Sequence, residues 1–279
     1  MDPAALEQRI LKLAAAERVD RDEVRAAVDS LLDGLEAGAV RAASHHDGSW
    51  RTHPWVKSGI LLGFRHGVNR VSAVPPVFAF RDRDTFPTLA SSLETRNVRI
   101  VPGGTSVRRG AYLGEGIVIM PPAYVNVGAW IGPGTMVDSH ALVGSCAQVG
   151  ARVHLSAAAQ IGGVLEPVGA LPVIVEDEVF VGGNCGVYEG TLVEAGAVLA
   201  AGVVLTHSVR VFDLVREREL RAAAGEPLTI PAGAVVVPGS RPAAGEFAQG
   251  RGLHLQAPMI VKYRDASTSA SAALEEALR

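Results

Sequence analysis

Two acidic side chains in the middle of the chain, Asp138 and Glu189, are candidates for acid–base chemistry. A carboxylate held beside an amine can take its proton, an effect worth about 10²–10⁴-fold in rate. Both residues also have ordinary structural interpretations. Asp138 directly follows a regularly spaced aliphatic residue, where Asp commonly serves turn geometry, and a single Glu such as Glu189 usually lies in solvent. Position alone therefore leaves their roles open.

Basic side chains in the same region suggest other kinds of chemistry. Arg108 could hold a carboxylate through paired hydrogen bonds. His140, His154 and His207 could bind zinc if neighbouring subunits contributed them, and His154 could alternatively act as a general base. The three histidines lack the His-x-x-x-x-His spacing that we would expect for such a zinc site. No metal is therefore predicted.

These residues lie in a stretch with a six-residue period. Small residues, mostly Ala, stand four positions after most of its regularly spaced aliphatic residues. This hexapeptide pattern is typical of a left-handed parallel β-helix, in which three hexads form a triangular coil that buries its apolar side against the next coil. The sequence therefore predicts a mainly β fold. The aliphatic residues form two runs that differ in phase: Val101, Val107, Leu113, Ile119, Val125, Ile131, Val137, Val143, Val149, Leu155 and Ile161, then Val175, Val181, Val187, Val193, Leu199, Leu205 and Val211.

The repeat suggests the domain organisation. We assign residues 1–100 to a small N-terminal α/β domain, 101–240 to the β-helix and 241–279 to a short C-terminal strand–helix segment. Two interruptions, near residues 167–174 and 212–229, are expected to bulge outward as loops, and such loops often line functional sites. The first interruption spans two residues more than two hexads.

Local signals predict the elements outside the repeat. The predicted elements are N-capped helices beginning at Asp2 and Asp20, a hairpin turn at Asp47-Gly48, a helix over residues 55–64, a strand over 258–263 and a terminal helix over 269–279.

Composition argues against several classes of partner. A net charge of −3 and a pI near 6.2 give no broad basic surface for nucleic acid. Gly, Pro or charged residues interrupt the apolar stretches before the roughly 18 residues that a membrane span requires. Cys146 and Cys185 form no C-x-x-C pair, which fits a reducing compartment. We therefore expect a cytoplasmic protein that binds neither nucleic acid nor membrane.

Specific strings resemble those of the tetrahydrodipicolinate N-succinyltransferase family. The likeness covers nearly the whole chain, including its N-terminal domain and its closing strand. It departs from the family pattern at His140, where the family has Trp, and at Gly186, where the family has an additional Glu. The strings are DGSW (47–50) and the segment through residue 65, VRRGAY (107–112), MPPAYVNVGA (120–129), GTMVD (134–138), VGSCAQVG (143–150), VHLS (153–156), IGGVLEP (161–167), YEG (188–190) and IVK (260–262).

The resemblance implies an activity and an assembly. Members of this family are trimers that transfer a succinyl group from succinyl-CoA to the amine of ring-opened tetrahydrodipicolinate, L-2-amino-6-oxopimelate. The reaction belongs to the succinylase branch of lysine and diaminopimelate biosynthesis. Carried over to this chain, the resemblance implies that Asp138 and Glu189 are catalytic, with Glu189 as a general base or as an acyl-accepting nucleophile. It also implies that Arg108 and Asp138 bind the substrate.

The donor's position can also be predicted. The phosphates of CoA require cationic or N–H donors, for which Lys262 is the first candidate, followed by Arg210 and Arg264. The general mode of donor binding in the family implies that the pantetheine arm lies near Ala201 and Gly202.

The hexad count places the two carboxylates relative to one another. After subtraction of the two-residue slip, Asp138 begins the first edge of a coil and Glu189 lies on a third edge, two coils later. At about 4.8 Å per layer they would be about 10 Å apart along the axis and on different sides. We therefore expect adjacent subunits of a homotrimer to share each active site.

Two alternatives remain open at this point. Within the same fold, the chain could use acetyl-CoA as an N-acetyltransferase or as an O-acetyltransferase, the latter with His154 as the base. The prism could also be a catalytically silent scaffold whose repeats only mediate assembly. Comparison of the two acyl donors would separate the enzymes, and CoA binding with turnover that depends on Glu189 would exclude the scaffold.

Overall fold

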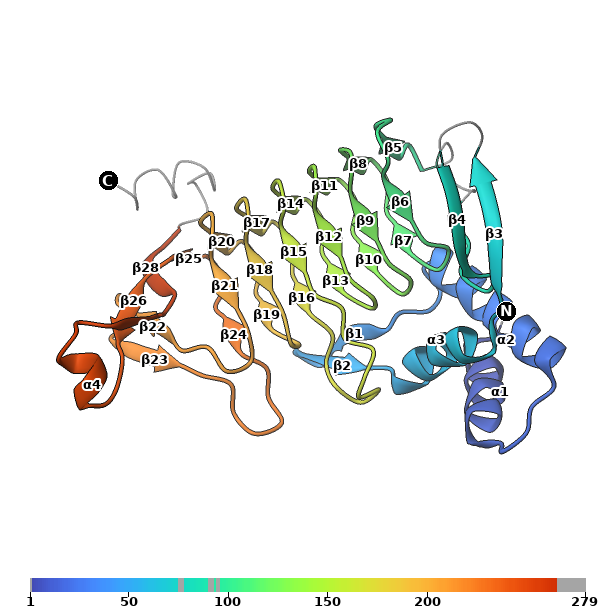
Figure 1. Cartoon of the computed structure of the whole chain (residues 1–279), viewed down its shortest axis with the longest axis horizontal. Coiled ribbons are helices and arrows are strands. Elements are labelled where there is room, and N and C mark those ends of the chain that lie inside the picture. The colour runs from blue at the N-terminus through green and yellow to red at the C-terminus, as the bar shows by residue number, and fades with distance from the viewer. Residues whose placement is uncertain (1, 75–77, 90–92, 94–95, 265–279) are drawn as a thin grey trace.

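Most of the chain forms a three-sided prism of short parallel strands (Figure 1). The structure is a computed structural model that describes residues 2–74, 78–89, 93 and 96–264. Successive strands pass in turn to the first, second and third sheet, so three strands make one coil. The fold is the predicted left-handed parallel β-helix.

The three sheets run along the length of the prism. The first contains β7 (Tyr112–Leu113), β10 (Trp130–Ile131), β13 (Gln148–Val149), β16 (Ile174–Val175), β19 (Leu192–Val193) and β24 (Thr229–Ile230). The second contains β5 (Arg99–Ile100), β8 (Val118–Ile119), β11 (Met136–Val137), β14 (His154–Leu155), β17 (Phe180–Val181), β20 (Val198–Leu199), β25 (Ala234–Val237), β28 (Met259–Tyr263), β22 (Val211–Asp213) and β23 (Arg218–Leu220). The third contains β6 (Ser106–Val107), β9 (Tyr124–Val125), β12 (Leu142–Val143), β15 (Gln160–Ile161), β18 (Gly186–Val187) and β21 (Val204–Leu205).

The aliphatic residues of the six-residue period fill the inside of the prism. All of them are buried except Val101, which is half-buried near the first coil. Each strand pairs in parallel with the strand eighteen residues later while the repeat is regular, as Val137 of β11 pairs with Leu155 of β14. Each coil therefore covers the apolar interior of its neighbour, which is the main source of stability in a stacked fold of this kind.

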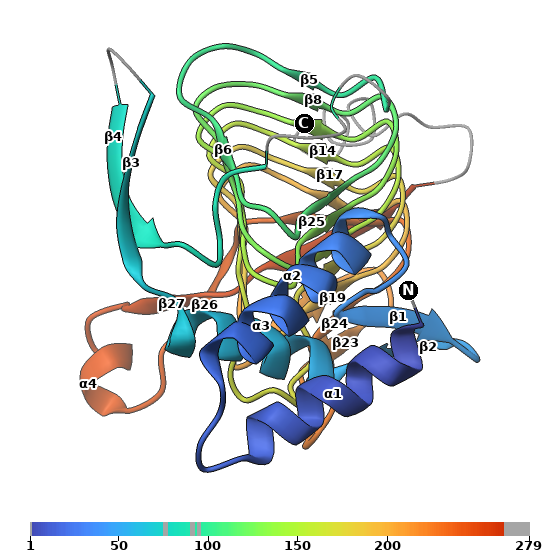
Figure 2. The same cartoon turned by 90° about the vertical axis from the view of Figure 1, so that its right-hand side faces the viewer.

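The N-terminal domain packs against the first coils (Figure 2). It contains the predicted helices and hairpin and a second hairpin that the sequence did not reveal. The side chains of Asp2 and Asp20 cap their helices. Val127 and Cys146, at corners of the prism, share one apolar cluster with the helices. The elements are α1 (Pro3–Ala15), α2 (Arg21–Glu36), β1 (Ala43–His46), β2 (Ser49–Thr52), α3 (Pro54–His66), β3 (Asn69–Val74) and β4 (Phe78–Arg83).

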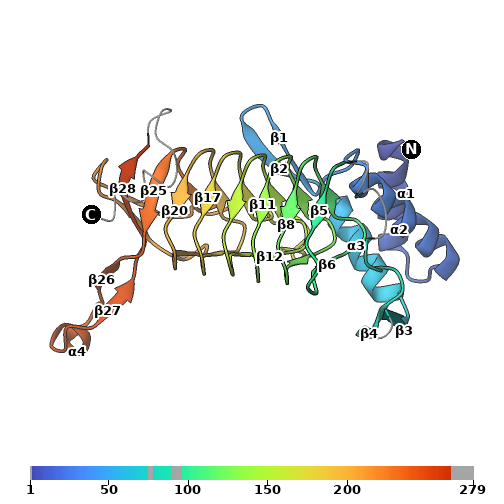
Figure 3. The same ribbon diagram turned by 90° about the horizontal axis from the view of Figure 1, so that it is seen from above.

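Both predicted interruptions leave the regular repeat. Residues 162–173 form a loop between β15 and β16, and residues 214–217 join β22 to β23 in an antiparallel hairpin. The predicted C-terminal strand is β28, which pairs antiparallel with β25. A further arm, made of β26 (Ser240–Pro242), α4 (Glu246–Gln249) and β27 (His254–Gln256), projects from this end of the prism (Figure 3). The helix predicted over 269–279 lies outside the described residues.

No helix among the described residues combines the length and the apolar character needed to cross a membrane.

Candidate functional site

Asp138 lies at a corner between the second and third sheets, directly after β11. Its half-buried carboxylate accepts a hydrogen bond from the backbone amide of Ser139 at 2.7 Å. The left-handed conformation at this corner belongs to the exposed His140, whose φ is 63°. Asp138 is therefore not the residue that takes the unusual backbone conformation of the turn, which weakens the purely structural interpretation of its position.

Glu189 lies at a corner between the third and first sheets, two residues after β18. It is exposed and has a φ of 55°, a conformation that Glu rarely adopts. Its Oε2 accepts a hydrogen bond from the backbone amide of His207 at 2.9 Å. Like Asp138, Glu189 forms no ion pair with any residue that the structure describes, so both carboxylates can act on a ligand.

The structure corrects the expected relation between the two carboxylates. Fourteen residues separate Ile161 from Val175, but they cover only one side of the prism, which normally takes six. The interruption therefore loops out eight residues and not two. Glu189 consequently follows a strand of the third sheet, one side after the second-sheet strand that precedes Asp138. The count from the sequence had put Glu189 two sides after Asp138.

Within one chain the two carboxylates nevertheless remain apart. The strand pairings β11–β14 and β14–β17 place the coil of Glu189 two layers after that of Asp138. Two layers correspond to about 10 Å along the axis, and the width of the third sheet lies between the two corners.

Arg108 is occupied by contacts within the chain. Its side chain is 17% exposed and its Nη2 lies 2.5 Å from Asp82 Oδ2. Its Nε donates to Tyr124 Oη at 2.6 Å, and its Nη1 donates to the carbonyl oxygen of Phe86 at 3.3 Å. These bonds join the first coil to the N-terminal domain. Arg108 also lies four coils before Glu189 along the same edge, so the structure does not bring these two residues together within one chain.

The three residues expected to bind CoA lie near one end of the prism. Ala201 and Gly202 form the corner after β20, where Ala201 is exposed and Gly202 has a φ of 79°. Lys262 lies on β28, and its partner in the sheet, Val235, pairs in turn with Val198 of β20. One strand thus separates Lys262 from the strand that precedes Ala201.

The other two cationic candidates are held by neighbouring groups. Arg210 forms an ion pair with Glu219 at 3.4 Å, and Arg264 donates to the carbonyl oxygen of Gly196 at 3.1 Å. The partner of Arg264 is a neutral carbonyl group, whereas the carboxylate beside Arg210 also accepts two hydrogen bonds from Arg221.

The three histidines lie at separate places on the prism. His140 and His207 occupy different corners, and the ring of His154 lies 5.2 Å from that of Phe180 on the second sheet. Within the part of the chain that the structure describes, no group of three or more His, Cys, Asp or Glu side chains has the arrangement of a metal site.

A cleft of about 410 Å³ between the β1–β2 hairpin and the corners that follow the first sheet was not expected from the sequence. There the Arg41 guanidinium lies 3.8 Å from the ring centroid of Trp130, which stacks on Tyr112 at 3.7 Å. Burial lowers the pKa of Arg41 to about 10. The signal that could have revealed this stack is the spacing of Tyr112 and Trp130, which equals one full coil.

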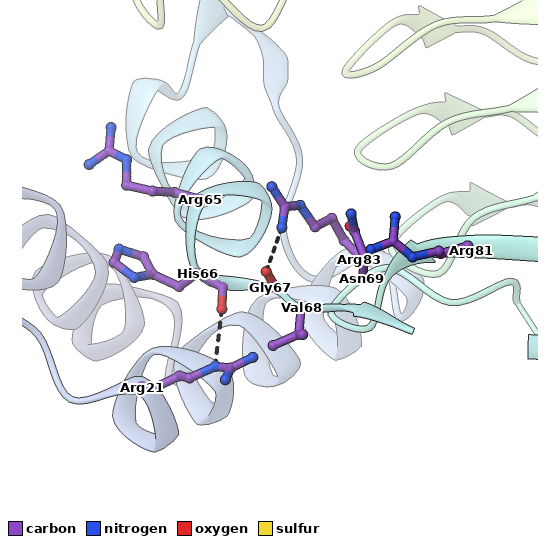
Figure 4. A pocket seen from close by; sticks show the side chains of 8 residues that line it. All are labelled: Arg21, Arg65, His66, Gly67, Val68, Asn69, Arg81 and Arg83. Atoms are coloured by element: carbon purple, nitrogen blue, oxygen red, sulfur yellow. Dashed lines mark hydrogen bonds between the residues drawn. The ribbon is translucent and has the colours of Figure 1, made fainter. Parts of the chain in front are cut away.

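A second cavity, of about 480 Å³, lies on the N-terminal domain and is lined by basic side chains (Figure 4). Arg21 and Arg83 donate to the carbonyl oxygens of His66 and Gly67 at its base. The adjoining cleft shares Arg21 and His66 and contains Asp22 and Asp84, so acidic groups lie close to this basic surface. Neither Asp138 nor Glu189 lines either cavity.

Comparison with known proteins places these features in context. Residues 6–66 match "Tetrahydrodipicolinate N-succinyltransferase N-terminal", and residues 172–207 match "Hexapeptide repeat of succinyl-transferase". Similar curated proteins include three named 2,3,4,5-tetrahydropyridine-2,6-dicarboxylate N-succinyltransferase. Those from Idiomarina loihiensis, Aromatoleum aromaticum and Polynucleobacter asymbioticus are 40%, 44% and 43% identical to this chain. The alignments cover 94%, 92% and 92% of this chain and 92%, 90% and 90% of the relatives.

Proposed function

This chain belongs to the tetrahydrodipicolinate N-succinyltransferase family, and we propose that it transfers a succinyl group from succinyl-CoA to the amine of ring-opened tetrahydrodipicolinate. This reaction serves the succinylase branch of lysine and diaminopimelate biosynthesis. The observation that carries the proposal is the pair of carboxylates, Asp138 and Glu189, which stand without cationic partners among the described residues at two edges of the same sheet.

Glu189 is the proposed general base. The His207 amide holds one of its oxygens at 2.9 Å, which leaves the other oxygen able to accept a proton. The substrate nitrogen attacks the thioester carbonyl carbon and transfers a proton to Glu189. The C–S bond then breaks, and the departing thiolate of CoA takes up the proton held by Glu189, which leaves the free thiol and restores the carboxylate. This role is worth about 10²–10⁴-fold in rate.

Asp138 is the proposed partner that binds and orients the amine. The backbone amide of Ser139 holds its Oδ1, and the second oxygen remains available to the substrate nitrogen. An ionised carboxylate also stabilises positive charge on the nitrogen as the N–C bond forms. Arg108 can bind a substrate carboxylate only if it exchanges its bond to Asp82 for one to the substrate.

We place the active site between subunits of a homotrimer. The N-terminal segment covers the outer face of the first sheet, where Gln148 and Ile174 are buried. Half-buried apolar side chains also lie on the outer faces of the second and third sheets, among them Met136, Phe180 and Leu142. A second copy packed on these faces would cover apolar surface and could bring Glu189 of the partner subunit towards Asp138.

The succinyl-CoA donor is proposed to lie along the edge formed by the second and third sheets. Ala201 and Gly202 occupy this edge three coils after Asp138, about 14 Å along the axis. Pantetheine bound there would reach from this end of the prism towards the Asp138 corner. Lys262 is proposed to contact the phosphates. The enzyme is assigned to the cytoplasm, where its two free cysteines would remain reduced.

A thiol-release assay with L-2-aminopimelate as a stable acceptor tests this function. We expect turnover with succinyl-CoA to exceed turnover with acetyl-CoA by at least about tenfold, because the donor's second carboxylate gives the site a charged group to recognise. Preference for acetyl-CoA would overturn the assigned donor. Absence of turnover with either donor, despite binding of CoA, would favour a non-catalytic scaffold.

A further inference from the structure

The loop formed by residues 162–173 joins β15 to β16 (Figure 1). These strands pair with β18 and β19, the two strands between which Glu189 lies one coil later. At its start, a Cβ atom placed on Gly162 would lie 2.8 Å from Cδ1 of Tyr188. At its end, a Cβ atom on Gly190 would lie 2.6 Å from the carbonyl oxygen of Leu171. The loop therefore touches both residues that flank Glu189 in the sequence.

The same loop is bound at its far end by the N-terminal domain. The Nζ atom of Lys57, on α3, donates to the carbonyl oxygen of Ala170 at 2.6 Å. The Oγ1 of Thr52 donates to the same oxygen at 3.3 Å. Ala170 immediately precedes Leu171, so the carbonyl held by Lys57 is next in sequence to the one that contacts Gly190.

The full burial of the charged side chain of Lys57 is unusual. Its side chain is 0% exposed, and it forms no ion pair in the part of the chain that the structure describes. Burial lowers its pKa, while the nearby Cys146 thiol, whose pKa burial raises to about 12, stays neutral at ordinary pH. A buried cation without a carboxylate is expensive. Replacement of a buried charged group by an apolar side chain of similar volume is often neutral or stabilising, so stability alone does not require the lysine.

We infer that Lys57 is a positioning residue for Glu189, acting through Ala170 and Leu171 of the loop. This inference rests on the catalytic role proposed for Glu189. Helix α3 is fixed to the prism because Ile60 packs in one cluster with Val127 and Cys146. A short bond from this fixed helix holds the end of the loop, and the loop in turn limits movement of the corner at Gly190. A displacement of about 1 Å in a catalytic group can cost about a hundredfold in rate.

The first test is the variant Lys57→Met, which keeps the length of the side chain and removes its charge and hydrogen bond. We expect an unchanged or higher melting temperature, a kcat lower by about ten- to a hundredfold and a nearly unchanged KM for succinyl-CoA. Amide hydrogen exchange should become faster over residues 163–173 and 188–190. Lys12→Met, at an exposed position on α1, is the matched control and should change none of these quantities.

A double-mutant cycle with Glu189→Gln provides the second test. If Lys57 acts through Glu189, Lys57→Met should cause little further loss of kcat in the Glu189→Gln background. The same fold loss in both backgrounds would overturn the inference, as would normal hydrogen exchange in the loop of Lys57→Met. Full activity of Glu189→Gln alone would instead refute the proposed catalytic base. Faster hydrogen exchange of the loop in Lys57→Met would then still show that Lys57 restrains the loop.

A milder variant covers the case in which Lys57→Met does not fold. Thr52→Val removes only the longer bond to Ala170 and leaves Lys57 in place. We expect kcat to fall by about two- to fivefold, with the same lack of additivity in the Glu189→Gln background. A fully active Thr52→Val enzyme with unchanged loop exchange, together with an unfolded Lys57→Met, would reduce Lys57 to a folding role and overturn the inference.

Discussion

The carboxylate of Glu189 accepts a hydrogen bond from the backbone amide of His207, which lies one coil later in the prism. The bond fixes one oxygen of an exposed side chain relative to a rigid ladder of strands. It also explains how Glu can adopt a φ of 55° at this corner, because the contact between side chain and backbone compensates part of the strain. This position therefore suits a side chain that ends in a carboxylate, or in an amide of the same shape, because either offers an oxygen to the His207 amide.

Replacement of Glu189 by Gln should separate this structural role from the chemical one. Gln retains an oxygen that can accept from the His207 amide, but it cannot take a proton from an amine at neutral pH. We expect kcat to fall by about 10²–10⁴-fold while the melting temperature stays within about 2 °C. Thiol release and thermal unfolding measure the two effects. Loss of activity only in proportion to loss of folded protein would contradict the assignment.

Mixed trimers should reveal whether subunits share the active site. Asp138→Ala and Glu189→Ala chains, unfolded together and refolded at equal amounts, should regain activity that neither variant shows alone. Roughly a quarter of the sites between subunits would then combine an intact Asp138 with an intact Glu189. If a single chain supplies both carboxylates to each site, the mixture should be as inactive as the separate variants.

The left-handed corner at Ala158 predicts a stabilising substitution. Ala158 has a φ of 58°, and its amide donates to the Ser139 carbonyl oxygen at 2.8 Å, a bond that Gly would preserve. Ala158→Gly should raise the free energy of unfolding by about 0.5–1 kcal/mol, because Gly adopts this conformation without strain. The neighbouring Ala157 is not left-handed, so Ala157→Gly should lower it by about 0.4–1 kcal/mol. Urea unfolding of both variants measures the contrast.

Asp213 should make the closing strand sensitive to acid. Burial would raise the pKa of this carboxyl, but hydrogen bonds from Tyr263, from the Arg216 amide and from Arg218 outweigh it and lower the pKa. A lowered folded-state pKa gives stability that is present above the unfolded value, near pH 4, and is lost as pH falls through the folded value.

The variant Asp213→Asn tests this dependence. It should lower the free energy of unfolding by about 1–3 kcal/mol at pH 7 and flatten its decline below about pH 4. Hydrogen exchange of β28 at pH 7 provides a local measurement, because Tyr263 lies on that strand. An equal decline with acid in both proteins would show that other carboxylates dominate.

The regular part of the fold was predictable because its information is local and repeated. Val137 and Leu155 occupy equivalent positions in successive coils, three hexads apart, so their inward orientation and mutual contact follow from counting. The corner geometry was harder, since the left-handed residue is His140 and no residue type marks it. Counting failed across residues 162–173, because spacing alone does not say how many residues leave the prism.

The environment of the site depended on contacts that no local pattern encodes. Lys57 and Ala170 are 113 positions apart, and Arg108 meets Asp82 from the other side of a domain boundary. Gly186, one departure from the family pattern, has no room for a side chain because Tyr188 covers it, at 2.4 Å from a Cβ placed there. The sequence shows that the glutamate is absent, but not that the ring of Tyr188 fills its space.

Because each side of the prism takes a constant number of residues, a deletion or insertion changes the position of every later residue in a predictable way. Deletion of one hexad between Asp138 and Glu189 would rotate everything downstream by a third of a turn and move Glu189 to another edge. Loss of a whole coil would keep its direction but shorten the separation by about 4.8 Å. Insertions and deletions can therefore accumulate in related chains without harm only where the chain already loops out of the prism, as in residues 162–173 and in the C-terminal arm.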